Sequence, residues 1–223
     1  MGVTYNPKIA TDGLVLCLDA ANRRSYPGTG TTWSDLAGAN DGTLTNMDAS
    51  NFSSDNRGAL SFDGSNEYIA RSNFIGTTST FSVCHWIKLA ANQNTRTIFS
   101  NYTSSNRGWV TGISDNSQNV VKFYLGNTVH LYASSALDIN VWYLVSVTYD
   151  NGNPKIYINE TLNNSSSSAT VVFGSTLYSN DIGRLGVGSQ YFNGSIANVF
   201  VYNRALTADE IRQNYNATKG RYL

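Results

Sequence analysis

Apolar and polar side chains alternate with a period of two along much of this chain, which is the pattern of β-strands that bury one face. The clearest case is the stretch WYLVSVTYDNGNPKIYINETL at 142–162, where positions 143, 145, 147 and 149 alternate with 144, 146 and 148. Asn151 and Gly152 then favour a tight turn, because both tolerate positive φ. Pro154 begins the return strand, where a missing N–H costs little. The pattern predicts a long antiparallel hairpin around which the other strands assemble.

The remaining strands follow from the same alternation. Segment 13–19 is apolar on both faces, which favours a central strand. Further strands are expected at 42–45, 59–62, 67–70, 80–89, 96–102, 108–114, 120–125, 129–133, 185–188 and 194–202.

One helix is expected, near the C-terminus. Thr207 and Glu210 have the spacing of an N-cap and its capping-box partner, and Gly220 can end the helix or the turn after it. No repeat or linker divides the chain. We therefore expect an extended arm at 1–12 and one all-β domain at 13–223, an antiparallel two-sheet sandwich with a short C-terminal helix.

Composition narrows the class of partner. Hydrophobic residues make up 41% of the chain and charged residues 13%, about half the usual share. Fifteen basic and fifteen acidic side chains cancel, which argues against nucleic acid as a partner. The sequence has no apolar run of membrane-spanning length, so membrane insertion is not expected, and the polar opening MGVTYNPKIATDG does not predict Sec-type export. Cys17 and Cys84 are interpreted as buried thiols, with a disulfide as the alternative if their strands are neighbours.

Four segments, taken in order, resemble the concanavalin A-like lectin/glucanase superfamily, in its laminin-G-like and pentraxin-like branch. They are LSFDGSNEYI at 60–69, FSVCHWI at 81–87, the hairpin at 142–162, and the segment 194–215. The opening at 13–22 and the ending at 203–222 are similar to the versions in virion proteins of tailed phages. The resemblance implies a jelly roll, often one that binds carbohydrate, sometimes through calcium.

The resemblance also implies a location for calcium, although no cofactor is required. Asp63 and Asn66 match the motif turn where oxygen ligands could begin, with Glu67 beside them. Many relatives carry an acidic residue where this chain has Ala197, and this departure weakens an inherited metal site. The alternative is that Asp63 caps its own turn through its side chain.

The inventory of reactive side chains predicts that the chain is not an enzyme. A glucanase needs two carboxylates facing one another across a cleft, and the three glutamates, at 67, 160 and 210, form no such pair. The two histidines, His85 and His130, are too few for a zinc site without other ligands, and His85 is interpreted as a partly buried strand residue.

Aromatic residues are the remaining candidates for binding. Trp86 and Trp142 lie in long strands and are core residues by default. Tyr102, Trp109 and Tyr191 flank polar or Gly-rich loops, so we expect them to stack on a sugar ring or on a neighbouring protein.

These features lead to two functional hypotheses. The first is a non-enzymatic virion structural protein of a tailed phage, decorating the capsid or associated with a fibre. It would be assembled in the host cytoplasm, placed on the outer surface of the virion, and attached to other virion proteins through the N-terminal arm. Binding of host-surface glycans and formation of a homo-oligomer are compatible with this role. The alternative is a carbohydrate-binding adhesin module of a bacterial surface or secreted protein.

Overall fold

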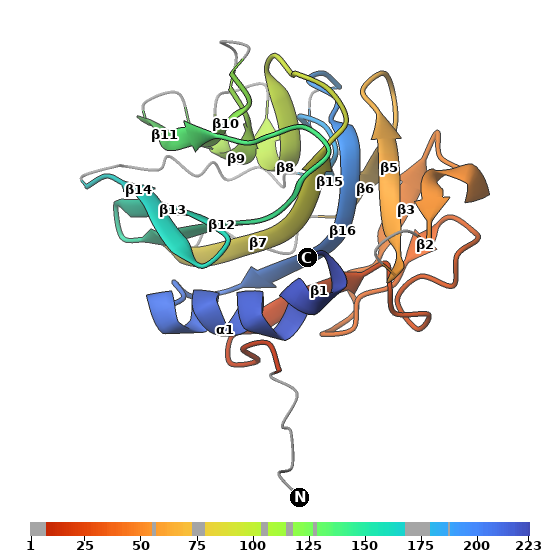
Figure 1. Ribbon diagram of the computed structural model, residues 1–223, viewed down its shortest axis with the longest axis horizontal. Coiled ribbons are helices and arrows are strands. Elements are labelled where there is room, and N and C mark those ends of the chain that lie inside the picture. Colours follow the sequence, from red (N-terminus) through yellow and green to blue (C-terminus); the bar gives the residue numbers. More distant parts are fainter. Residues whose placement is uncertain are drawn as a thin grey trace, which may run out of the picture.

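The computed structural model describes residues 8–54, 57–72, 79–103, 107–114, 118–126, 129–167, 179–186 and 188–223. In these residues the strands form two antiparallel sheets of eight strands each, and one α-helix lies near the C-terminus (Figure 1). The predicted all-β sandwich with a C-terminal helix is therefore confirmed.

Both sheets contain strands from widely separated parts of the chain. Sheet A has the order β14 (Thr161–Ser165), β13 (Asn153–Ile158), β12 (Trp142–Asp150), β7 (Thr80–Leu89), β16 (Asn193–Tyr202), β5 (Ala59–Asp63) and β4 (Phe52–Ser53), with β1 (Leu14–Asp19) also paired to β16. Sheet B has the order β11 (Val129–Ala136), β10 (Val120–Leu125), β9 (Arg107–Ile113), β8 (Arg96–Thr103), β15 (Asn180–Ile182), β6 (Tyr68–Ala70), β3 (Gly42–Thr45) and β2 (Thr32–Trp33). The helical elements are η1 (Ala49–Asn51), α1 (Ala208–Thr218) and η3 (Lys219–Arg221).

The hairpin at the centre of the sequence prediction is present, but it is not the centre of its sheet. Asn151 and Gly152 have φ values of 45° and 96°, and Asp150 pairs with Asn153 across the turn. The middle of sheet A is instead β7 paired with β16, and the hairpin lies towards the β14 edge. The reason is that β7 and β16 are both ten-residue strands, each paired on both sides.

Two other strand predictions need correction. Strand β1 has both faces covered, as its sequence indicates, yet it pairs only with β16 and is not central. The described residues of segment 185–188 form no extended strand: Leu185 makes an isolated bridge to Ser189, and the N–H of Gly188 donates to the carbonyl of Leu185 (2.8 Å). Strand β15, which precedes this segment, fills the place between β8 and β6.

Large aromatic side chains fill the space between the sheets. Trp33 of β2 has no exposed surface. The ring of Phe81 is stacked on Trp109 at 5.1 Å and meets Phe123 edge-on at 6.1 Å. Burying aromatic and aliphatic surface of this extent is the main source of stability for such a sandwich.

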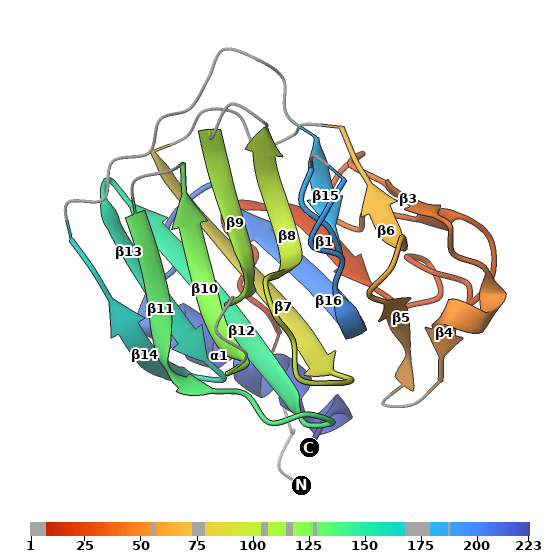
Figure 2. The same ribbon diagram turned by 90° about the horizontal axis from the view of Figure 1, so that it is seen from above.

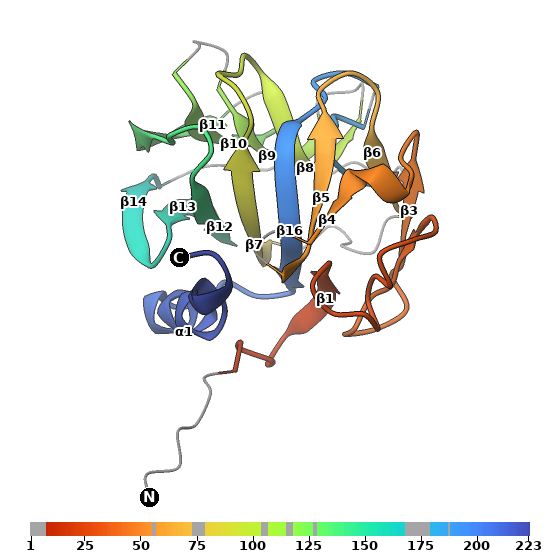
Figure 3. The ribbon, with the colours of Figure 1, turned by 45° about the vertical axis from the view of Figure 1, so that its right-hand side comes forward.

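The outer face of sheet A is also buried, because α1 lies across it (Figures 1 and 3). Trp86 of β7 stacks on Tyr215 of α1 at 5.8 Å and on Tyr222 at 4.4 Å, and Trp86 Nε1 donates a hydrogen bond to Thr218 Oγ1 (2.8 Å). Trp142 of β12 belongs to the same cluster. Both tryptophans are core residues, as predicted, but in a second core between sheet and helix.

The described part of the N-terminal arm, residues 8–12, docks on the same domain. Gln213 Nε2 donates to the carbonyl of Lys8 (2.8 Å), and the N–H of Ala10 donates to Asn214 Oδ1 (2.8 Å). Residues 1–7 lie outside the described residues, so attachment through the arm stays a prediction.

The two cysteines are free thiols rather than a disulfide. Cys17 and Cys84 each pair with Phe200 of β16 from opposite sides, so a whole strand separates them. Burial raises the pKa of Cys17 to about 12 and that of Cys84 to about 11. Both thiols are therefore held in the unreactive, protonated form.

Candidate functional site

The two outer faces of the sandwich differ, because α1 covers that of sheet A and leaves that of sheet B uncovered (Figures 1 and 2). The outer face of sheet B carries a pocket of about 210 Å³. It is lined by Thr95, Tyr102, Val110, Lys122, Tyr124, Leu185 and Gln190.

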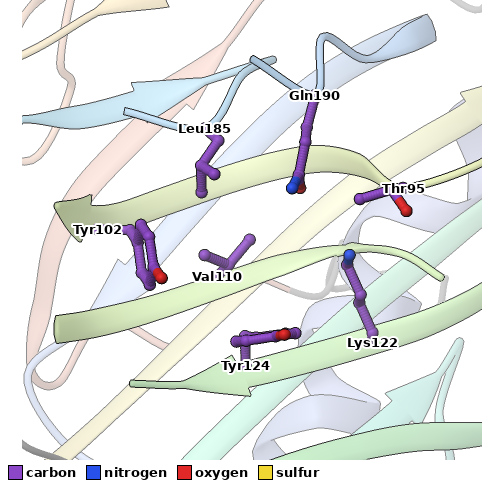
Figure 4. Close-up of a pocket in the computed structure, with 7 residues that line it drawn as sticks. All are labelled: Thr95, Tyr102, Val110, Lys122, Tyr124, Leu185 and Gln190. Carbon is purple, nitrogen blue, oxygen red and sulfur yellow. The ribbon is translucent and has the colours of Figure 1, made fainter. Parts of the chain in front are cut away.

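Three adjacent strands supply the base of this pocket by period-two alternation. In β10, Val121, Phe123 and Leu125 enter the core, so Lys122 and Tyr124 point outward. Figure 4 shows these side chains around the pocket, with Tyr102 from β8 and Val110 from β9.

The turn formed by residues 183–186 and 188–190 is the opposite wall. The N–H of Gly183 donates to the carbonyl of Ile98 (2.8 Å), and the N–H of Thr97 donates to the carbonyl of Gln190 (2.8 Å). A Cβ on Gly186 would lie 2.7 Å from the carbonyl oxygen of Tyr102, so only glycine allows the turn to approach β8 this closely. These contacts hold Leu185 and Gln190 over the pocket (Figure 4).

The pocket combines aromatic faces with hydrogen-bond donors. The half-buried rings of Tyr102 and Tyr124 lie at its border, and Lys122 Nζ lies 5.5 Å from the Tyr124 ring centroid. The pKa of Tyr102 is raised, mainly by burial and to a smaller extent by the nearby Tyr124, so its phenol stays protonated at neutral pH. Gln190 Oε1 accepts a hydrogen bond from Thr97 Oγ1 (3.2 Å), which orients the amide and leaves its Nε2 donor for a ligand.

The structure separates the three aromatic residues predicted to bind. Tyr102 lines the pocket. Trp109 does not: it has no exposed surface, because it sits on the inward side of β9 between Phe81 and Phe99. The expectation that Trp109 stacks on a ligand is thus corrected, since its faces are occupied by the core.

Tyr191 lies beside the pocket but does not line it. The ring centroids of Tyr191 and Tyr68 are 6.5 Å apart. The Arg184 guanidinium carbon lies 3.4 Å from the centroid of the Tyr68 ring. Arg184 is fixed by a 2.7 Å ion pair with the buried Asp181. Tyr191 therefore belongs to an aromatic and cationic cluster next to the turn formed by residues 183–186 and 188–190.

The turn predicted to bind calcium is capped by its own residues. Asp63 ends β5, Asn66 lies in the turn before β6, and both are exposed. Asp63 Oδ1 accepts from the N–H of Ser65 (2.7 Å), and Glu67 Oε2 accepts from the N–H of Asp63 (2.7 Å). In the described ranges no group of three or more His, Cys, Asp or Glu side chains could hold a metal ion. Calcium at Asp63 and Asn66 stays a prediction.

The buried histidine is not part of a site. His85 has no exposed surface and is more buried than expected, and burial lowers its pKa to about 3. The side chain of His130 is outside the described part of the structure. None of the described helices is long and apolar enough to cross a membrane.

Sequence reasoning missed most of the pocket. Lys122 and Tyr124 carried a usable signal, because they alternate with core residues on the predicted strand 120–125. Leu185 and Gln190 carried none, since their position depends on a turn that crosses from β15 to β16 over β8.

Comparison with solved structures places this fold within larger proteins. A mutant of Trypanosoma rangeli sialidase with trans-sialidase activity superposes with a TM-score of 0.70 at 17% identity, over 96% of this chain and 34% of the sialidase chain. The binding domain of botulinum neurotoxin serotype D superposes with a TM-score of 0.68 at 18% identity, over 92% of this chain and 51% of the neurotoxin chain. A heptameric SAP-like pentraxin from Limulus polyphemus superposes with a TM-score of 0.54 at 20% identity, over 68% of this chain and 78% of the pentraxin chain. At these identities the likeness shows the fold, and the chain spans about a third of the sialidases.

The sialidase matches contradict the prediction that this chain is not an enzyme. The first structures found are enzymes that contain this fold, so the absence of a paired carboxylate does not exclude an enzymatic protein. The exclusion rested on the missing carboxylate pair of glucanases and on the small number of histidines, and it is withdrawn.

Sequence comparison identifies the family directly. The search of curated proteins found no match. A laminin-G-type family profile, described as the concanavalin A-like lectin/glucanases superfamily, matches residues 63–212, well over half of the chain. The match includes most strands of both sheets and the start of α1. This chain belongs to the concanavalin A-like lectin/glucanases superfamily.

Proposed function

We propose that this domain binds carbohydrate in the pocket on the outer face of sheet B. The observation that carries the proposal is the combination of Tyr102 and Tyr124 with Lys122 and Gln190 in one pocket, on the sandwich face that α1 leaves open. Pockets that join apolar walls to a few oriented polar groups are typical ligand sites.

The chemistry of the pocket suits a sugar ring. The C–H face of a pyranose packs against an aromatic ring, and the rings of Tyr102 and Tyr124 at the border of the pocket can make this contact. The hydroxyl groups of the sugar accept hydrogen bonds from Lys122 Nζ and Gln190 Nε2. They can also donate to the Thr95 hydroxyl or accept a hydrogen bond from it. A solved sialidase of the same fold holds sialic acid, which supports a saccharide as the ligand class without locating the site in this chain.

We further propose that the domain is displayed on the outside of a tailed-phage virion, where it binds glycans of the host surface. The support is the similarity of segments 13–22 and 203–222 to those of phage virion proteins. In this setting the N-terminal arm attaches the domain to a capsid or fibre protein. Mass spectrometry of purified virions tests the placement, and absence of the chain from the particles would favour a bacterial adhesin instead.

A glycan array tests the binding function. Wild-type protein is expected to bind a defined set of glycans, and Tyr124→Ala is expected to lose that binding about tenfold or more because the stacking ring is gone. Tyr124→Phe is the matched control: it keeps the ring and should keep most of the affinity. Equal binding by wild type and Tyr124→Ala would overturn the pocket assignment.

Two additions to the same array separate the remaining hypotheses. Glycan binding measured in calcium and in EDTA tests the site at Asp63 and Asn66. If EDTA abolishes glycan binding and Asp63→Asn causes the same loss, a calcium site is supported. Release of free sugar is recorded in parallel, because the fold also occurs in sialidases.

A further inference from the structure

A second pocket lies beside the edge strand β4 of sheet A, away from the pocket on sheet B. In Figure 2, β4 lies on the side of the molecule opposite β10 and β11. The pocket has a volume of about 200 Å³. Its lining includes Arg23, Tyr26, Pro27, Phe52 and Arg57.

Backbone geometry fixes two arginines at this pocket. Arg23 lies in a turn closed by hydrogen bonds from the N–H groups of Ser25 and Tyr26 to the carbonyl of Asn22, both 2.8 Å. Arg57 has a φ of 64° and is followed by Gly58. A Cβ atom placed on Gly58 would lie only 2.8 Å from the carbonyl oxygen of Ala20, so the two backbone segments are very close here. This close approach holds the backbone of Arg57 next to the loop that carries Arg23.

Two aromatic rings also line this pocket. The rings of Tyr26 and Phe52 are 5.6 Å apart and tilted, and the Tyr26 hydroxyl donates to the carbonyl of Gly30 (3.1 Å). Tyr26 is buried, whereas Phe52 and Pro27 reach the surface. The pocket thus offers an apolar side for a ring and a cationic side for a substituent.

Neither Arg23 nor Arg57 has an acidic partner within the described structure, whereas Arg184, Arg204, Arg212 and Arg221 all do. Two carboxylates in the described part of this region already have partners. Asp19 is bonded to Arg221, and Asp48 accepts from the N–H and hydroxyl of Ser50.

We propose that this pocket binds the oxyanion of an acidic saccharide, a carboxylate or a sulfate, held between the guanidinium groups of Arg23 and Arg57. Guanidinium forks recognise planar and tetrahedral oxyanions through paired charge-assisted hydrogen bonds. The sugar ring of the same residue packs on the Phe52 and Pro27 side. The site is independent of the sheet B pocket and stands whether or not that pocket binds sugar.

Titration calorimetry with defined tetrasaccharides tests this site. The probes are a uronate tetramer, a sulfated galactan tetramer and neutral cellotetraose, and the first two distinguish a carboxylate from a sulfate. We expect saturable binding of at least one acidic probe, and a loss of about tenfold or more in Arg23→Gln and in Arg57→Gln, because each variant removes charge-assisted hydrogen bonds.

Arg24→Gln is the matched control, because Arg24 is an exposed neighbour that does not line the pocket. It removes the same charge and should leave affinity unchanged. An equal loss in Arg24→Gln would show general electrostatic attraction and overturn the site, as would no binding of either acidic probe. Tyr124→Ala should bind the acidic probes normally, so failure of the sheet B pocket and failure of this site give different results.

Discussion

At the scale of single residues, His85 is the most unusual feature of the core. It lies on the inward side of β7 between Val145 of β12 and Val199 of β16, and neither ring nitrogen has a hydrogen-bond partner among the described residues. A buried polar group without a partner costs about 1–3 kcal/mol of stability. Because burial lowers the pKa of His85 to about 3, the folded protein holds the imidazole neutral over most of the acid range.

This predicts an acid-dependent stability that one substitution removes. The unfolded chain takes up a proton at His85 near pH 6.5 and the folded chain does not, so the free energy of unfolding falls as pH drops below about 6.5. At pH 7, the free energy of unfolding of His85→Leu should exceed that of wild type by about 1 kcal/mol. At pH 5 this difference should be larger by about a further 2 kcal/mol. Urea unfolding at both pH values measures the difference. A gap between the two proteins that does not change with pH would contradict the assignment to His85.

At the scale of elements, α1 acts as a cover for sheet A and depends on its first turn. Thr207 Oγ1 accepts from the N–H of Glu210 (3.3 Å), and Glu210 Oε2 accepts from the N–H of Thr207 (2.9 Å). Arg204 adds a bidentate ion pair to Glu210 at 2.9 and 2.6 Å and, with the cap, lowers the pKa of Glu210 to about 2. The stability that Glu210 contributes is therefore present above about pH 4.5 and lost as pH falls towards 2.

Removal of the cap tests this view of the helix. Thr207→Ala should lower the free energy of unfolding by about 1 kcal/mol, because an N–H group at the helix start loses its partner. Asp209→Ala is the control, since its exposed ion pair with Arg212 should be worth less than about 0.5 kcal/mol. Urea unfolding followed by tryptophan fluorescence measures both, as Trp86 and Trp142 lie beneath α1. Equal losses in the two variants would refute a specific role for the cap.

At the scale of the whole molecule, the two ends of the chain are joined at one buried residue. Asn214 has no exposed surface; its Oδ1 accepts from the N–H of Ala10 (2.8 Å), and its Nδ2 donates to the hydroxyl of Tyr202 (3.0 Å). That hydroxyl donates in turn to the carbonyl of Ala10 (2.9 Å). The arm, the central strand β16 and α1 are therefore linked on the covered side of the sandwich.

Replacing Asn214 should loosen this side as a unit. Asn214→Ala leaves the buried N–H of Ala10 without an acceptor and the Tyr202 hydroxyl oxygen without a donor. We therefore expect a loss of about 2–3 kcal/mol in the free energy of unfolding and faster amide hydrogen exchange at Ala10. Gln213→Ala removes only an exposed hydrogen bond to Lys8 and should cost less than about 1 kcal/mol. Unchanged exchange at Ala10 in Asn214→Ala would show that the arm is held by other contacts.

The sequence alone determined the features that depend on neighbouring residues. The hairpin at Asn151 and Gly152 and the cap at Thr207 follow from backbone preferences and local hydrogen bonds, so they could be predicted without a partner segment. Period-two alternation likewise located most of the strands, but it missed the short strands β2, β4, β14 and β15. The order of recognisable segments gave the superfamily.

Only the tertiary structure decided what lies next to what. Leu144 and Ser146 were expected on an open face of β12, yet both are buried, because α1 returns from the end of the chain to cover them. Trp109 and Tyr102 flank the same loop, but the pleat of each strand sends one ring into the core and the other to the surface. Both pockets gather side chains from segments far apart in sequence. Their composition is a property of long-range packing, which no local pattern encodes.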